Sequence, residues 1–287
     1  MIIKKTFLIA LLVGLFLMLN SCGGQKPEYA SPEGYDFANP EKMLQKESLL
    51  EISGISFLGK GDTLLSVNDE EGKVFLVSWM GNKNRSIRFS SQGDFEDVTH
   101  YKNRIFIIRS DGTVYVLPDT VRKKIEGPQA KVKLPKGEYE SIFADEQANK
   151  LYVLCKRPRN KKDENRPDKI FGHVFTLFND SITGSDNFKI DLASLPPFKN
   201  PKKLFAPSAF AKNNATNEWY ILSSANKVLL IADADWKPKA VYPLNPDLFN
   251  QPEGLAFDKD NNLYISNEGD ELQYGNILKF TFSAPTH

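Results

Sequence analysis

The chain has 287 residues, of which 25% are charged and 41% hydrophobic, and its 37 basic and 36 acidic residues leave a formal net charge of +1. This balance argues against a nucleic-acid partner held by phosphate contacts, and the apolar content excludes a disordered chain. Two cysteines and three histidines are too few for a disulfide scaffold, a tetrahedral thiolate zinc site or a histidine-rich metal site.

The beginning of the chain has the pattern of a secretory signal. Two lysines precede an apolar run of 14 residues, Thr6–Leu19, which is shorter than the roughly 20 residues that a membrane-spanning helix needs. The run ends in Leu-Asn-Ser-Cys, which resembles a bacterial lipobox and predicts a signal peptide over residues 1–21 with a lipid on Cys22. The alternative is an ordinary cleaved signal in which the cysteine is incidental.

A lipid on Cys22 would hold the protein on a membrane. We therefore expect it in the bacterial cell envelope, lipid-anchored, with its domain outside the cytoplasm. Residues 22–34 are glycine, proline and polar residues, and they predict a flexible tether between the lipid and the domain. The other cysteine, Cys155, follows an apolar run and is expected to be a buried small hydrophobic residue.

The rest of the chain, residues 35–287, contains five copies of one unit. Each copy begins with a small or acidic residue, then a small or polar residue, then apolar positions. This motif starts at Ser53, Glu96, Glu140, Ser208 and Glu253, at spacings of 43, 44, 68 and 45 residues. The long third spacing contains a charged insert, residues 156–169, which we expect to be a solvated loop rather than a binding element.

Further β-rich runs follow each motif. Second strands are predicted over 64–69, 105–110, 151–156, 219–224 and 263–268, and third strands over 72–77, 112–117, 172–177, 226–231 and 275–280. Fourth strands are predicted over 86–89, 131–134, 188–191 and 240–244, so the last unit is one strand short.

One four-stranded sheet cannot bury both of its faces, but sheets stacked around an axis can. The repeats therefore predict an all-β fold, a five-bladed β-propeller of four-stranded antiparallel blades. A ring of this kind is stable only when its last sheet is complete. We expect the segment Tyr35–Phe37 to supply the missing strand and so remove an exposed sheet edge.

Several of these motifs resemble the SdiA-regulated (YjiK-like) family of bacterial envelope proteins. The resemblance is carried by LLEISGISF (49–57), GDFEDVTH (93–100), IFIIRSDGTVYVL (105–117) and QPEGLAFDKDNNLYISNEG (251–269). It covers about residues 35–282 and implies a five-bladed propeller, distantly related to NHL-repeat propellers, that binds calcium at a shared site. The Pro-Glu-Gly around Glu253 is also similar to gluconolactonase-type propellers, in which such a glutamate binds a divalent metal.

The first motif position is the strongest candidate for a metal site. Equivalent positions of successive blades surround the axis at one level, so Glu96, Glu140 and Glu253 should converge near one mouth of the channel. Unit charges about 4 Å apart repel each other by about 4 kcal/mol at an effective dielectric of 20. Ligands that are all oxygen favour a hard ion, so we predict bound calcium. The alternative is that these glutamates pair with Arg109 or accept hydrogen bonds from backbone amides.

Weaker metal candidates lie beside this level. Glu51 would replace the carboxylate that is missing at Ser53, or it pairs with a lysine at the surface. Four turn residues should lie at the same end of the ring and extend an oxygen-rich site, although ordinary hairpin chemistry is the alternative for each. They are Asn68, Asp69, Asn267 and Glu268.

Two functions follow from these observations. The first is a non-catalytic, membrane-tethered propeller that binds an unknown small molecule or protein, with calcium as a structural or recognition ion. The second is a metal-dependent hydrolase of the lactonase or gluconolactonase type, in which His100 would act as the base. No GxSxG, HExxH or phosphate-binding glycine motif is present in the sequence, and this favours the first function.

Overall fold

The computed structural model of the chain describes residues 29–45, 49–79, 84–120, 130–158, 168–178, 181–195, 204–270 and 273–284. The predicted signal peptide, the predicted lipidation site Cys22 and most of the predicted tether lie outside these residues. No helix among the described residues is long and apolar enough to cross a membrane.

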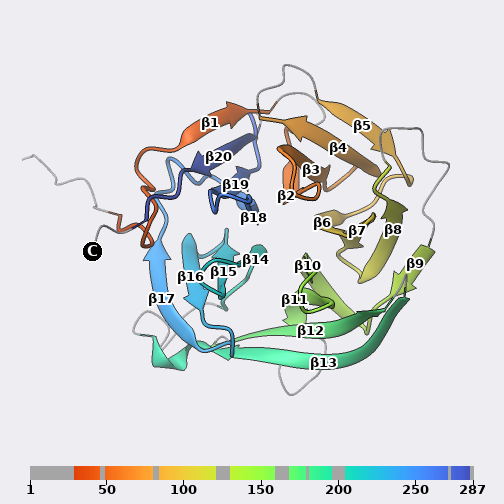
Figure 1. The fold of residues 1–287 in the computed structure, drawn as a ribbon. Coiled ribbons are helices and arrows are strands. Elements are labelled where there is room, and N and C mark those ends of the chain that lie inside the picture. Colours follow the sequence, from red (N-terminus) through yellow and green to blue (C-terminus); the bar gives the residue numbers. More distant parts are fainter. Residues whose placement is uncertain are drawn as a thin grey trace, which may run out of the picture.

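Five four-stranded antiparallel sheets surround a common axis as the blades of a β-propeller (Figure 1). Blade 1 contains β2 (Ile52–Phe57), β3 (Thr63–Asn68), β4 (Lys73–Ser78) and β5 (Arg85–Arg88). Blade 2 contains β6 (Phe95–Tyr101), β7 (Arg104–Arg109), β8 (Thr113–Pro118) and β9 (Ala130–Lys133). Blade 3 contains β10 (Gly137–Asp145), β11 (Lys150–Pro158), β12 (Lys169–Phe178) and β13 (Ser181–Asp191). The predicted fold class is confirmed.

The remaining two blades are built in the same way. Blade 4 contains β14 (Ala209–Asn213), β15 (Glu218–Ser223), β16 (Val228–Ala232) and β17 (Pro238–Pro243). Blade 5 contains β18 (Pro252–Phe257), β19 (Leu263–Asn267), β20 (Asn276–Phe280) and, from the other end of the chain, β1 (Glu41–Leu44). A short 3₁₀ helix, η2 (Leu192–Ser194), follows β13, whose long hairpin with β12 runs along the outside of the ring (Figure 1).

The core consists of five hydrophobic clusters, and each cluster lies between two neighbouring blades. The third motif position contributes one buried residue to every cluster. These residues are Ile55, Val98, Ile142, Phe210 and Leu255. Because each cluster needs two blades, the sheets cannot bury their faces separately and the ring must close.

The ring closes through β1, which pairs with β20 in the register Glu41↔Lys279 to Leu44↔Asn276. Closure by an N-terminal strand is thus as expected, but the expected position at Tyr35–Phe37 is wrong. The reason lies in the backbone, since Phe37 N donates to Ser31 Oγ and Tyr35 N donates to the Pro32 carbonyl, so neither N–H group is free for a ladder.

Tyr35 and Phe37 instead pack as core residues against blades 4 and 5. The ring of Phe37 lies 4.5 Å from that of Phe280, and Tyr35 Oη donates to the Asn261 carbonyl at 2.8 Å. Both side chains are buried, with exposed fractions of 4% and 7%. The segment therefore stabilises the closure by apolar packing, and β1 supplies the hydrogen bonds.

The inner strands approach each other most closely at the second motif position. A Cβ added to Gly54 would lie 2.0 Å from Asp97 Oδ1 and 2.4 Å from Asp97 Cα. Asp97 Oδ2 in turn accepts hydrogen bonds from Ser141 Oγ and from Ile142 N, the latter at 3.0 Å, so blades 1, 2 and 3 meet here. We call this level the waist, and it separates the two ends of the propeller.

Candidate functional site

The three predicted glutamates sit at the same backbone irregularity in three blades. The register of the inner strand shifts between Phe95 and Asp97 in β6, between Tyr139 and Ser141 in β10, and between Pro252 and Gly254 in β18. The residues left out of the strand pairing are Glu96 in β6, Glu140 in β10 and Glu253 in β18. A bulged residue is unpaired in the ladder, and the kink re-aims its side chain. The bulges therefore turn these glutamates out of the regular alternation of the strand.

The three glutamates lie at one end of the axis, which we call the glutamate end. Glu140 is buried, and Glu96 and Glu253 are half-buried. Burial and the charges of Glu140 and Asp94 raise the pKa of Glu96 to about 10. Burial and the charges of Glu140 and Glu268 raise the pKa of Glu253 to about 8. Each group thus lies in the electric field of another, which places the three glutamates at the same end of the ring. Their convergence on one ion stays a prediction.

Lys156 forms an ion pair with this cluster. Its Nζ lies 2.7 Å from Glu140 Oε1, and Glu140 is almost completely buried. Burial raises the pKa of Glu140 to about 7, and the ammonium of Lys156 opposes that rise. Arg109, which the sequence offered as a partner, instead binds Asp111 with Nε 3.1 Å from Oδ1. Burial lowers the pKa of Lys227 and the charge of Glu253 opposes that effect, so Lys227 is a second lysine near the cluster. Of the three glutamates, only Glu140 forms an ion pair with a described residue.

A second acidic group lies at the same end, between blades 1 and 5. Burial and the charges of Glu51 and Glu268 raise the pKa of Asp69 to about 6. Gln251 Nε2 donates to Glu268 Oε2 at 2.5 Å, and this hydrogen bond partly offsets the effect of burial, which raises the pKa of Glu268. Three of the weaker sequence candidates are thus brought together. Because Glu268 also raises the pKa of Glu253, the two acidic groups are linked.

The two asparagines among the weaker candidates have structural contacts. Asn68 Oδ1 accepts a hydrogen bond from Glu71 N at 3.0 Å, which is ordinary hairpin chemistry. Asn267 Nδ2 donates to Asn276 Oδ1 at 3.0 Å, across the β19–β20 pair. Asn267 Oδ1 is buried without a hydrogen-bond partner. Asn267 is thus the one of the two that offers a spare oxygen.

The donor chemistry of this end suits a hard cation, but its arrangement does not yet form a metal site. Within the described residues, no group of three or more aspartate, glutamate, histidine or cysteine side chains is close enough to hold a metal ion. Lys156 also lies where Glu140 would face a cation. Calcium at Glu96, Glu140 and Glu253 stays a prediction, and it would require these carboxylates to move closer together.

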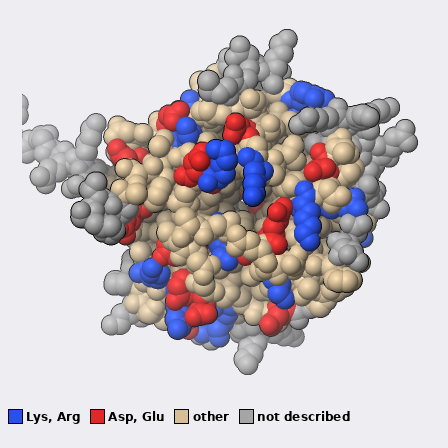
Figure 2. Space-filling view, viewed as in Figure 1, with Lys and Arg blue, Asp and Glu red and all other residues tan. Residues whose placement is uncertain are grey.

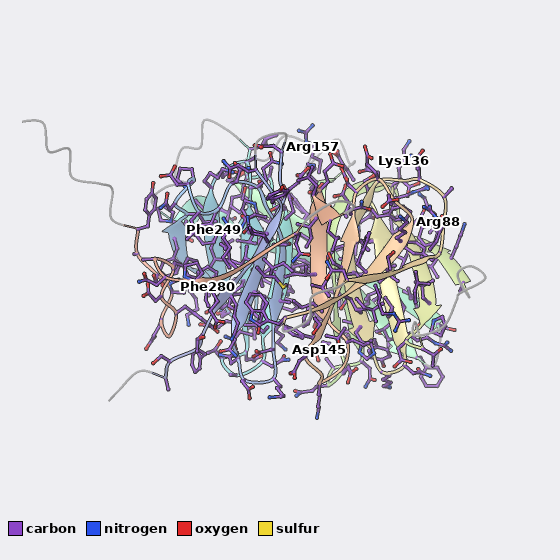
Figure 3. The ribbon with its side chains drawn as sticks, turned by 90° about the horizontal axis from the view of Figure 1, so that it is seen from above. Arg88, Lys136, Asp145, Arg157, Phe249 and Phe280 are labelled. Carbon is purple, nitrogen blue, oxygen red and sulfur yellow. The ribbon has the colours of Figure 1, made fainter. Side chains whose placement is uncertain are left out.

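A polar cavity of about 750 Å³ opens beside the cluster, between blades 2 and 3. Glu96 and Lys156 lie on its wall, and Leu134 is its one large apolar residue. The rest of the wall is Asp94, Ser110, Asp111, Lys133, Lys136, Gly137 and Glu138. In Figure 3 the labelled Lys136 and Arg157 lie at one end of the axis, and Asp145 lies at the opposite end. The cavity therefore gives solvent access to the glutamate end.

His100, the base of the hydrolase hypothesis, lies at the other end of β6. Four residues separate it from Glu96, which is roughly 13 Å along a strand. Its Nδ1 accepts a hydrogen bond from Gly59 N at 3.2 Å, and its Nε2 lies 3.5 Å from Asp119 Oδ2. These contacts link blades 1 and 2, so His100 is a structural residue at a blade junction.

Cys155 is buried, as the sequence predicted. Burial raises the pKa of its thiol to about 12. A thiol with so high a pKa carries almost no thiolate at neutral pH, so it is a poor nucleophile. Neither His100 nor Cys155 therefore supplies a nucleophile or a base to the glutamate end.

These features place the chain in a class, that of β-propellers with an acidic cluster at one mouth. Residues 30–274 match the SdiA-regulated family, and the chain belongs to that family. A search of curated proteins found no match.

The chain is similar to solved structures at low sequence identity. A luciferin-regenerating enzyme is 10% identical with a TM-score of 0.51, covering 85% of this chain and 95% of its own. A structural genomics protein of unknown function from Bacteroides thetaiotaomicron VPI-5482 is 17% identical with a TM-score of 0.46, over 76% of this chain and 52% of its own. At these identities the similarity concerns the fold alone.

Two features of the site were not found from the sequence. The bulges depend on the register between two strands, and a single strand does not show its register. Lys156 begins the charged insert of the third unit, and nothing local in the sequence marks it as the partner of Glu140. Its place in the repeat was the available signal, since it aligns with Asp69 and Glu268 in the blades where the second acidic group forms.

Proposed function

We propose that this protein is a non-catalytic binding propeller of the cell envelope whose glutamate end takes up a cation. The observation that carries the proposal is a charge imbalance: Glu140 raises the pKa of both Glu96 and Glu253, and of the three only Glu140 forms an ion pair with a described residue, Lys156. Burying unpaired charge is costly, so such groups either hold protons or acquire a counter-ion. The raised pKa values of Glu96 and Glu253 are the sign of that cost.

Calcium is the cation that the donor set favours. A divalent ion would offset part of the negative charge that Glu96, Glu140 and Glu253 carry when they are ionised. Calcium also accepts six to eight oxygen ligands in flexible geometry, so carboxylates that are not yet gathered tightly suit it better than the strict octahedron of magnesium. Glu51, Asp69 and Glu268 add further negative charge at the same end.

The membrane anchor is the second part of the proposal. It rests on the lipobox-like Leu-Asn-Ser-Cys that ends at Cys22. An anchored propeller presents its ligand site at a fixed distance from a membrane, where an unknown small molecule or protein would be bound. If a Cys22→Ala variant stays on membranes after a carbonate wash, the lipid anchor is refuted.

A metal-dependent hydrolase is the less favoured function. A hydrolase needs a base beside the metal-bound water, and His100 lies beyond the waist from the glutamates. Among the described residues that line the 750 Å³ cavity, the side chains are carboxylates, lysines, a serine and a leucine, with no histidine. A binding role needs only the charged wall that is present.

The proposal is tested by thermal unfolding with calcium and with a chelator. Binding to the folded state alone stabilises a protein by about 2.7 kcal/mol at a hundredfold excess over Kd. We expect millimolar calcium to raise Tm by several degrees over the chelated protein, and magnesium to raise it less. The triple variant Glu96→Gln, Glu140→Gln, Glu253→Gln should lose this response. Equal Tm values with chelator and with calcium would refute the cation site.

A further inference from the structure

The end of the propeller beyond the waist contains a second cavity, of about 580 Å³, which the proposed function does not use. All five inner strands line it. Its apolar wall includes the partly exposed Phe143 and the small side chains of Ala211 and Ala256. Lys60, Lys212 and Lys259 also lie on the wall, and we call this the lysine end. Lys259 Nζ pairs with Asp260 Oδ2 at 2.6 Å. A concave, partly apolar cavity of this volume is typical of sites for small organic ligands.

The buried acidic residues of this cavity already use their oxygens as hydrogen-bond acceptors. Asp145 Oδ1 accepts from Gln147 N and Ala148 N at 3.0 and 2.9 Å, and its Oδ2 accepts from Lys212 Nζ at 3.0 Å. The Asp258 carboxylate is occupied by two backbone N–H groups, the Asn262 amide and the Tyr264 hydroxyl. The carboxylates therefore hold turns in place.

Two further acidic residues, Asp97 and Glu146, lie on the wall of this cavity. Asp97, at the waist, accepts hydrogen bonds from Val98 N, Ser141 Oγ and Ile142 N. Glu146 is exposed at the mouth, and its Oε1 accepts from Lys102 N at 2.6 Å. No buried carboxylate oxygen on the described part of this wall is left without a donor.

Lys212 and Lys60, in contrast, have N–H donors that no described residue accepts. Asp145 Oδ2 is the one hydrogen-bond acceptor of Lys212 Nζ among the described residues, so two of its three N–H groups are available. The Lys212 side chain is only 17% exposed, and its Nζ lies 5.9 Å from the ring centre of Trp219. Lys60 is exposed at the mouth and makes no ion pair with a described residue. The free hydrogen-bonding groups of these lysines are donors, so they suit a ligand that accepts hydrogen bonds.

We propose that this cavity binds a small organic carboxylate whose apolar body packs against Phe143, Ala211 and Ala256. The carboxylate would accept charge-assisted hydrogen bonds from Lys212, and Lys60 would add positive charge at the mouth. The half-buried position of Lys212 strengthens such a bond because water competes less there. Both charge signs are mixed on the surface around the axis in Figure 2, so the selectivity comes from the cavity and not from a field over the whole face.

The experiment uses 3-phenylpropionate and its neutral carboxamide as matched probes, with affinities measured by titration calorimetry on the purified protein. The Lys212→Met substitution alone would leave Asp145 buried and unpaired, which can unfold a protein. The informative variants are therefore Asp145→Asn and the double variant Asp145→Asn, Lys212→Met. An asparagine at position 145 keeps an oxygen for the turn N–H groups and releases Lys212 from its ion pair. The control is Lys239→Met on β17, which removes the ion pair between Lys239 and Glu218.

We expect the acid to bind at least tenfold more tightly than the amide to the wild type and the control. Asp145→Asn should bind the acid at least as tightly as the wild type, and the double variant should lose tenfold or more of that affinity. Intermolecular nuclear Overhauser effects to Phe143 and Ala211 should locate the probe. Equal affinity for acid and amide, no binding of either probe, or unchanged affinity for the acid in the double variant would overturn the proposal.

Discussion

The two ends of the propeller are built from the same five inner strands, yet their hydrogen-bonding capacity is opposite. At the glutamate end, Glu96 and Glu253 lie in the field of Glu140, and of the three only Glu140 forms an ion pair with a described residue. At the lysine end, the carboxylates of Asp145 and Asp258 are occupied, and lysines are left with free donors.

The difference comes from where each carboxylate falls relative to a turn. An aspartate that ends an inner strand can accept the N–H groups of the following turn, as Asp145 and Asp258 do. A glutamate in a β-bulge has no turn N–H groups beside it, and its side chain leaves the ladder. Acidic residues thus hold the backbone at one end and remain available for a ligand at the other.

The largest effect on stability is expected from a substitution that creates a steric clash at the waist between the two ends. In a Gly54→Ala variant the new Cβ would meet the Asp97 side chain and backbone, and overpacking of this kind costs about 3 kcal/mol or more where the backbone must shift. The expected result is a large fall in the free energy of unfolding, measured by denaturant titration.

Gly61→Ala is the matched control, because its nearest neighbour would lie 3.5 Å away at the Leu58 carbonyl. Its stability should change by about 0.5 kcal/mol or less. Equal stability of the two variants would mean that the inner strands are not in close contact at the waist.

The next largest effect on stability is expected at Lys156, which pairs with Glu140 at the glutamate end. Lys156→Met removes the charge that opposes the raised pKa of Glu140. Leaving a buried charged group unsatisfied costs about 1–3 kcal/mol. Because the glutamates are more ionised at higher pH, the loss should be larger at pH 8 than at pH 5. Equal losses at both pH values would show that Lys156 acts only through packing.

A smaller effect with the opposite sign is expected for Glu96. Its pKa is raised from 4.5 to about 10 on folding, so in that window the folded chain holds a proton that the unfolded chain has lost. Stability therefore falls as pH rises from about 4.5 toward 10. Glu96→Gln removes this dependence, so it should be more stable than the wild type at pH 8, and the difference should shrink as pH falls toward 5. Stability curves of wild type and variant that stay parallel between pH 5 and pH 8 would contradict this assignment.

The blades and the level of the glutamates could be predicted from the sequence because both follow from local repetition. The repeated motif suffices to bring Glu96, Glu140 and Glu253 to one end of the ring. The register shifts, the ion pair of Lys156 and the carboxylate of Asp97 at the waist depend on contacts between strands or blades, which a single sequence does not show.

The closing strand illustrates the same limit. Tyr35 and Phe37 alternate as a strand would, and their side chains are buried. Their N–H groups, however, are bound within local turns, so the ladder forms at the more polar segment Glu41–Leu44. Burial could be predicted from side chains, whereas pairing depended on the backbone.

The account is tested most directly by the ionisation of the glutamates themselves. Carboxyl-carbon nuclear magnetic resonance of labelled protein, assigned with single Glu→Gln variants, would give the pKa of Glu96, Glu140 and Glu253 with chelator and with calcium. We predict that Glu96 is protonated at pH 7 without calcium and ionised when calcium is added. A Glu96 that titrates near 4.5 in both samples would contradict the charge imbalance on which the account rests.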